Sequence, residues 1–95
     1  MVEIDFARVN IIVTGRVQGV FFRASALEQA QSYGIKGWVQ NLPDSSLEIE
    51  AEGPRYALEE FIKWCKHGPP DAFIKEVFIR WGKYQNEFTT FRICG

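Results

Sequence analysis

The stretch G-R-V-Q-G-V-F-F-R, residues 15–23, places two glycines and an arginine directly before a predicted helix. A Gly-bounded turn backed by a helix N-terminus presents successive backbone N–H groups to one point, and such a concave site binds anions, phosphate above all. Arg23 stands where the helix dipole is already positive, which is unfavourable unless an anion lies beside it. Its planar guanidinium can bind two phosphate oxygens at once. The spacing therefore indicates a candidate phosphate site, with a tight turn and a solvated arginine as the alternative.

The residues around this loop narrow the chemistry. No G-K-[ST] follows the glycines, so the loop is not an ATP-binding P-loop, and it holds no cysteine that could act as a phosphatase nucleophile. A site with no nucleophile, evident metal ligand or nearby histidine suits a substrate that needs positioning and charge stabilisation. An acyl phosphate is such a substrate, because its carboxylate leaves without protonation. We expect neither a metal nor a cofactor.

A water must still be oriented for hydrolysis, and Asn41 has a suitable side chain. Its amide both donates and accepts hydrogen bonds, and it stands where a predicted strand gives way to a turn. Asparagine is also a common turn residue, and from the residue type alone that interpretation is the more frequent one.

Hydrophobic periodicity predicts the elements that position these residues. Alternation indicates strands over residues 7–14, 35–41, 46–52 and 72–82, with a short last strand over 88–93. Helical spacing indicates a helix over 22–33, and a second one that opens at Gly53-Pro54 and ends at Gly68-Pro69-Pro70. The order β-α-β-β-α-β predicts an α+β, ferredoxin-like sandwich: an antiparallel sheet of four to five strands with both helices on one face. We expect a single domain over residues 1–95.

Composition excludes several other classes of protein. With 46% hydrophobic residues the chain is too apolar to be disordered, and a net charge of −1 disfavours broad attraction to nucleic acid or to anionic lipid. No apolar run is long enough for a transmembrane helix, and the N-terminus lacks a secretion signal. Cys65 and Cys94 have no metal-ligand spacing, so we interpret them as packing residues in a cytoplasmic protein.

Three further groups have ordinary explanations. His67 is expected to be a surface or capping residue at the end of the second helix. Glu48, Glu50 and Glu52 alternate along a strand, which predicts a row of carboxylates on a solvated face rather than a metal site. We expect the three tryptophans to be packing residues, and the Gln18 side chain to shape the loop without a chemical role.

The stretches 15–23, A-x-x-x-G-I-K-G-W-V-Q-N (residues 30–41) and D-S-S-L-E (residues 44–48) together resemble the acylphosphatase family, and the resemblance covers essentially the whole chain. It implies the same ferredoxin-like fold and the metal-free, cofactor-free hydrolysis of small acyl phosphates to a carboxylate and inorganic phosphate. It also implies that Arg23 binds the substrate phosphate and that Asn41 orients the attacking water. The backbone amides expected to complete the phosphate site are those of Arg16, Val17, Gln18, Gly19 and Val20.

The sequence departs from the family pattern in two places. Asp44-Ser45 stands where many members have Asp-Gly, and serine adopts a positive φ less readily than glycine. The end, Cys94-Gly95, replaces a basic or aromatic residue that often follows the isoleucine.

Two alternatives remain beside a monomeric, stand-alone enzyme that binds neither nucleic acid nor membrane. One is a binding module of the same fold that reads RNA or senses a ligand, which the acidic strand disfavours. The other is a carbamoyl-phosphate-handling part of a larger maturation enzyme, which the length of 95 residues disfavours.

Overall fold

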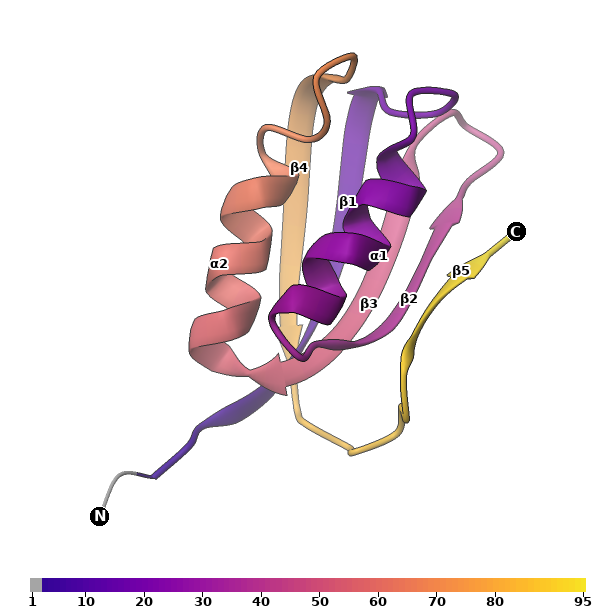
Figure 1. Cartoon of the computed structure of the whole chain (residues 1–95). Helices are drawn as coiled ribbons and strands as arrows, with labels where there is room; N and C mark the ends of the chain where they lie inside the picture. The colour runs from indigo at the N-terminus through magenta and orange to yellow at the C-terminus, as the bar shows by residue number, and fades with distance from the viewer. Residues whose placement is uncertain (1–2) are drawn as a thin grey trace.

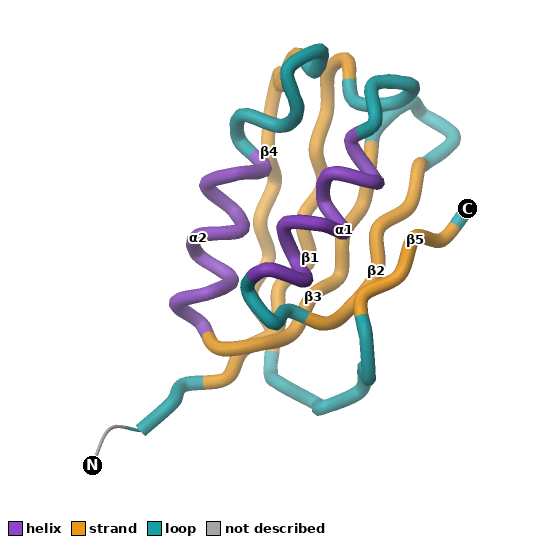
Figure 2. Tube along the Cα trace, viewed as in Figure 1, coloured by secondary structure: helices purple, strands orange, loops and turns teal. Residues whose placement is uncertain are grey.

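A five-stranded sheet with two helices on one face forms the molecule (Figures 1 and 2). The computed structural model describes residues 3–95, so the first two residues of the predicted domain lie outside the described part. The observed elements differ from the predicted ones by three residues or fewer at each end. They are β1 (Phe6–Arg16), α1 (Phe22–Ser32), β2 (Lys36–Asn41), β3 (Leu47–Pro54), α2 (Arg55–Cys65), β4 (Phe73–Gly82) and β5 (Phe91–Cys94).

The strand order is β4-β1-β3-β2-β5. The prediction of an antiparallel sheet is correct for the first four strands and wrong for β5, which pairs in parallel with β2. The reason is topological: β4 and β5 occupy opposite edges, and the segment between them passes below one end of the sheet (Figure 1). The chain therefore re-enters in the direction opposite to β4, which is the direction of β2.

The core lies between the sheet and the two helices, as the periodicity predicts. Val9, Ile11 and Val13 of β1 are fully buried against the apolar side of α2. Each large apolar side chain buried in this way contributes about 1.5–3 kcal/mol. Helix α1 instead faces the sheet with the small residues Ala26 and Ala30, which let its backbone lie close to the strands that carry the candidate site. The buried hydrophobic residues of β3 and α2 are Leu47, Ile49, Ala51, Ala57, Leu58, Phe61, Ile62 and Cys65.

The carboxylate row on the other face is not the solvated surface that alternation predicts. Glu52 is only 3% exposed, and it accepts hydrogen bonds from the amides of Gln85 and Glu87 at 2.6 and 2.8 Å. Glu50 pairs with Arg8 Nε at 2.6 Å. Burial alone would raise the pKa of Glu52, but the amide hydrogen bonds and the charge of Arg8 outweigh it and hold that pKa below its ordinary value. The prediction is wrong because the segment after β4 folds back over this end of β3.

His67 and two of the three tryptophans, Trp64 and Trp81, behave as expected. His67 is exposed at the end of α2, with Nδ1 2.9 Å from the Lys63 carbonyl oxygen. Trp64 packs on the Phe22 ring at 5.2 Å between centroids, and the Arg55 guanidinium lies 4.0 Å from the Trp81 ring centroid. No helix in residues 3–95 is long and apolar enough to cross a membrane.

Candidate active site

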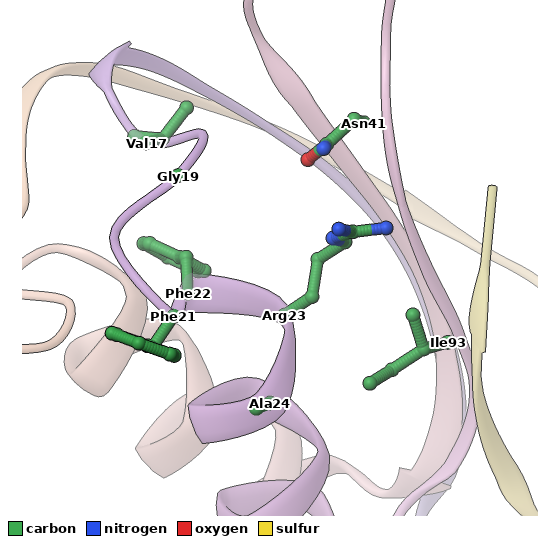
Figure 3. A pocket seen from close by; sticks show the side chains of 8 residues that line it. All are labelled: Val17, Gly19, Phe21, Phe22, Arg23, Ala24, Asn41 and Ile93. Atoms are coloured by element: carbon green, nitrogen blue, oxygen red, sulfur yellow. The ribbon is translucent and has the colours of Figure 1, made fainter.

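A cavity of about 340 Å³ opens at the N-terminal end of α1, beside the carboxyl end of β2 (Figure 3). It brings Arg23 and Asn41 together although they are far apart in the chain, and it includes Val17 and Gly19 of the predicted phosphate loop. Arg16, Gln18 and Val20 do not line it. The lining residues are Val17, Gly19, Phe21, Phe22, Arg23, Ala24, Asn41 and Ile93.

Both glycines of the loop have conformations that the loop requires. Gly15 lies in β1 at a register shift and has φ 117°; a Cβ added there would lie 2.2 Å from the Phe73 carbonyl oxygen. Gly19 has φ 74° with open space around it, so its requirement is conformational rather than steric. The backbone can therefore leave the sheet and reverse toward α1 within residues 17–20.

The loop amides lack backbone partners in the part of the chain that the structure describes. Within residues 3–95, the N–H groups of Val17, Gln18, Gly19 and Val20 donate no backbone hydrogen bond. Backbone donors that are not paired within the chain are satisfied by water or by a ligand. The loop thus carries four consecutive donors beside the cavity, which is the arrangement expected of an anion site.

The Gln18 side chain connects this loop to the turn that follows Asn41. Its Nε2 donates to the carbonyl oxygens of Leu42 and Ser46 at 2.9 and 2.8 Å. These two residues also face each other across the turn, with the Leu42 amide donating to the Ser46 carbonyl. Gln18 therefore sets the separation between the loop and the strand end that carries Asn41.

Arg23 lies in the first turn of α1, which contains no acidic residue. Its half-buried side chain extends toward Asn41 (Figure 3), and Nη1 donates to the main-chain carbonyl oxygen of Gly95. Among the ion pairs of residues 3–95, none involves Arg23. The guanidinium thus adds a positive charge to the positive end of the helix, with the Gly95 main-chain oxygen rather than an acidic side chain as its partner.

Asn41 is the last residue of β2 and shares the helix-facing side of Val39. Its Oδ1 is buried and finds no hydrogen-bond partner within residues 3–95. Leaving such an acceptor unpaired costs about 1–3 kcal/mol, and buried polar atoms are paired in the large majority of cases. An unpaired acceptor that borders a cavity indicates a position where a ligand or a reacting water supplies the donor.

Residues 9–93 match the family model described as Acylphosphatase. The chain belongs to the acylphosphatase family. A relative named acylphosphatase from Pyrobaculum islandicum is 47% identical over 87 residues, which are 90% of this chain and 92% of the relative. The crystal structure of an acylphosphatase from Bacillus subtilis superposes with a TM-score of 0.90 at 35% identity and covers 94% of this chain and 99% of that one.

The same fold also occurs inside a much larger protein. Full-length HypF, solved in a phosphate- and nucleotide-bound form, matches 99% of this chain with a TM-score of 0.89 and 36% identity, but the match covers only 12% of HypF. Relatives covered almost completely by this chain carry the name acylphosphatase. Sequence and fold together thus identify an acylphosphatase, an enzyme that hydrolyses acyl phosphates.

The departure at Asp44-Ser45 leaves the turn of this acylphosphatase in the conformation that glycine would favour. Ser45 has φ 76°, and the Ser45 amide donates to the Leu42 carbonyl oxygen at 3.2 Å. Asp44 Oδ1 accepts from both the hydroxyl and the amide of Ser46, and these hydrogen bonds lower the pKa of Asp44. The turn therefore keeps its geometry by accepting strain at Ser45.

Sequence reasoning missed four residues of the acylphosphatase pocket, and among them Phe22 was expected only as a buried residue of the helix. Ile93 reaches the pocket because β5 pairs in parallel with β2, opposite Val39, which no local pattern indicates. Ala24 and Phe21 belong to the start of α1, and Phe21 has the left-handed backbone angles φ 64° and ψ 22°. Phenylalanine rarely adopts that conformation, so no sequence pattern predicts it at this position.

Proposed function

We propose that the enzyme hydrolyses acyl phosphates without a metal, with Arg23 and the amides of residues 16–20 binding the phosphoryl group while Asn41 orients the attacking water. One observation carries the proposal. Within residues 3–95, an arginine with no acidic side chain as partner and an asparagine with an unpaired buried acceptor border the same cavity, next to a loop whose amides donate no backbone hydrogen bond.

Phosphate binding follows from the charges at this end of the sheet. A phosphoryl group between the loop and Arg23 would accept hydrogen bonds from the loop N–H groups and offset the guanidinium charge at the helix N-terminus. Hydrogen bonds to charged groups contribute about 1.5–3 kcal/mol each. A phosphoryl group offers two oxygens to the guanidinium, whereas the Gly95 main-chain oxygen accepts a hydrogen bond from Nη1 alone.

The reaction then needs only an oriented water. Asn41 Oδ1 accepts a hydrogen bond from one O–H of the water, which orients a lone pair of the water oxygen toward phosphorus. The new P–O bond forms as the bond between phosphorus and the acyl oxygen breaks on the opposite side. The carboxylate leaves with the electron pair, and the proton of the water passes to the product phosphate or to solvent. Arg23 and the loop amides stabilise the charge on the equatorial oxygens throughout.

The chemistry of the lining residues supports the metal-free route. Among the residues around the cavity, none carries a carboxylate, imidazole or thiol, which are the side chains that hold Mg²⁺ or Zn²⁺. A carboxylate leaving group needs no protonation, so the proposal requires no general acid.

We infer further that the enzyme acts as a monomer in the cytoplasm and does not bind nucleic acid. Both cysteines are free, and the sheet face opposite the helices carries the carboxylates of β3. Gel filtration tests the monomeric state, and filter binding to single-stranded RNA at low salt tests the absence of nucleic-acid binding.

Hydrolysis of benzoyl phosphate in EDTA tests the mechanism with the wild type, Arg23→Ala and Asn41→Ala. A preorganised polar group in an active site is worth about 100- to 1,000-fold in kcat, so we expect Asn41→Ala to lose that much while its inhibition constant for orthophosphate stays within about twofold. Arg23→Ala should lose both turnover and orthophosphate inhibition. Arg80→Ala, an exposed arginine on β4, is the matched control and should retain full activity.

Two results would contradict the assignment. If EDTA abolished wild-type turnover and a divalent metal restored it, the metal-free route would be wrong. If Asn41→Ala lost orthophosphate binding and kept its kcat, the two side chains would have exchanged roles.

A further inference from the structure

Phe21 breaks three local preferences at the rim of the cavity. It precedes α1 as the N-cap, where small polar residues are favoured, and makes no side-chain capping hydrogen bond. Its backbone is left-handed, with φ 64° and ψ 22°, which strains a bulky side chain. Phe21 is 78% exposed, more than any other large apolar residue in residues 3–95.

The fold does not require a phenylalanine at this position. The left-handed backbone turns the chain so that Phe22, the next residue, is 1% exposed and packs on Trp64, while Phe21 stays outside. Glycine or asparagine would adopt the same angles with less strain and without exposing an aromatic ring. Such departures gather at functional sites, where the strained residue acts on a ligand.

In-line displacement determines where the acyl group lies. The inference of that position rests on the roles proposed above for Arg23 and Asn41. The carboxylate leaves opposite the attacking water, so the acyl group points away from Asn41. Figure 3 shows Asn41 at the upper right of the cavity with the Arg23 guanidinium close to it, and Phe21 on the opposite side, at the lower left. Ala24, three residues after Phe21, lies next to it on the helix surface and adds an exposed methyl group.

We propose that Phe21, with Ala24, is the specificity-determining surface on which the acyl group of the substrate packs. The preferred substrates are acyl phosphates whose acyl group is apolar and flat, aromatic ones above all, because an aromatic group gains from both area and ring stacking. Arg23 is the one charged residue among those that line the cavity, and the phosphate engages it. A charged or small polar acyl group therefore gains no comparable contact.

The test is the ratio of kcat/KM for benzoyl phosphate to that for acetyl phosphate, since both substrates share the phosphoryl chemistry. Phe21→Gly removes the ring and suits the backbone angles, and Phe21→Leu keeps an apolar side chain without the ring. An aromatic contact of this kind corresponds to about a 3- to 10-fold effect, so we expect the ratio to fall by that factor in Phe21→Gly and less in Phe21→Leu. The orthophosphate inhibition constant should stay at the wild-type value.

Phe78→Ala is the matched control, because Phe78 is a half-exposed phenylalanine on the opposite face of the sheet. Its ratio should equal that of the wild type. An unchanged ratio in Phe21→Gly, or an equal loss with both substrates, would overturn the acyl-binding role while leaving the proposed function intact. A wild type that hydrolyses neither acyl phosphate would overturn the proposed function and this inference with it.

Discussion

Replacing Asn41 by alanine should separate activity from stability, because the wild-type side chain is costly to the fold. Its buried Oδ1 has no partner within residues 3–95, and removing such an acceptor recovers about 1–3 kcal/mol. Truncation of the side chain gives up about 1 kcal/mol of packing. The net change in the free energy of unfolding lies between zero and about +2 kcal/mol, which in a domain of this size raises Tm by up to about 10 °C.

Asn10 provides the matched control on the opposite face of the sheet. Its Nδ2 donates to Glu48 at 2.9 Å and to Glu50 at 2.8 Å. Asn10→Ala removes both contacts and should cost about 1–2 kcal/mol, or about 5–10 °C in Tm. Thermal melts by circular dichroism and benzoyl phosphate turnover are measured on the wild type and both variants.

We expect the two variants to have opposite effects on stability and on activity. Asn41→Ala keeps or gains stability and loses about 100- to 1,000-fold in kcat, whereas Asn10→Ala loses stability and keeps kcat. A clear fall in Tm for Asn41→Ala with near-normal turnover would refute the reasoning, since the amide would then be a structural turn residue whose oxygen is paired in solution.

Four further predictions concern the turn, the loop, the open face and the cysteines. Ser45→Gly should raise Tm by about 4–8 °C, because it relieves about 1 kcal/mol of strain at φ 76°; a lower Tm would show that the serine side chain stabilises the turn. Gln18→Ala should lower Tm by about 5–10 °C, since two carbonyl oxygens lose a donor, and should lower kcat/KM as the loop loses its connection to the strand end. The depressed pKa of Glu52 contributes stability above the ordinary carboxyl pKa of about 4.5 that is lost as the pH falls through the folded value; Glu52→Gln should therefore lower Tm at pH 7 and flatten its decline between about pH 5 and 3. Burial raises the pKa of the Cys65 thiol and makes it unreactive, so a thiol reagent should label Cys94 alone in the folded protein and both cysteines after unfolding.

The elements that rest on local periodicity could be predicted from the sequence. Val9, Ile11 and Val13 alternate in β1, and the apolar residues of α2 recur at helical spacing, so burial follows directly from the pattern. Arg23 and Asn41 could be singled out because each is a polar residue next to a break in that pattern. Their presence on one cavity follows from the predicted order of strands and helices.

Contacts between distant segments could not be predicted. The burial of Glu52 depends on the amides of Gln85 and Glu87, which reach it only because the chain crosses from one sheet edge to the other. Ile93 enters the pocket for the same topological reason. The link from Gln18 to the turn is likewise tertiary, since nothing in the loop sequence specifies which carbonyl oxygens its amide meets.

Several features that destabilise the fold lie together in the candidate site, at one end of an otherwise well-packed sandwich. Phe21 contributes about 1–2 kcal/mol of backbone strain, the Asn41 oxygen about 1–3 kcal/mol, and Arg23 a few tenths through the helix dipole. Their sum is a sizeable part of the 5–15 kcal/mol that typically separates folded from unfolded domains. Two of these costs diminish in the complex we propose: the phosphoryl group neutralises Arg23 and the attacking water donates to Asn41. An acyl group on Phe21 covers the exposed ring without changing its backbone. The strained conformation therefore persists through the reaction, and it is this persistence that would keep the acyl-binding surface in place before substrate arrives.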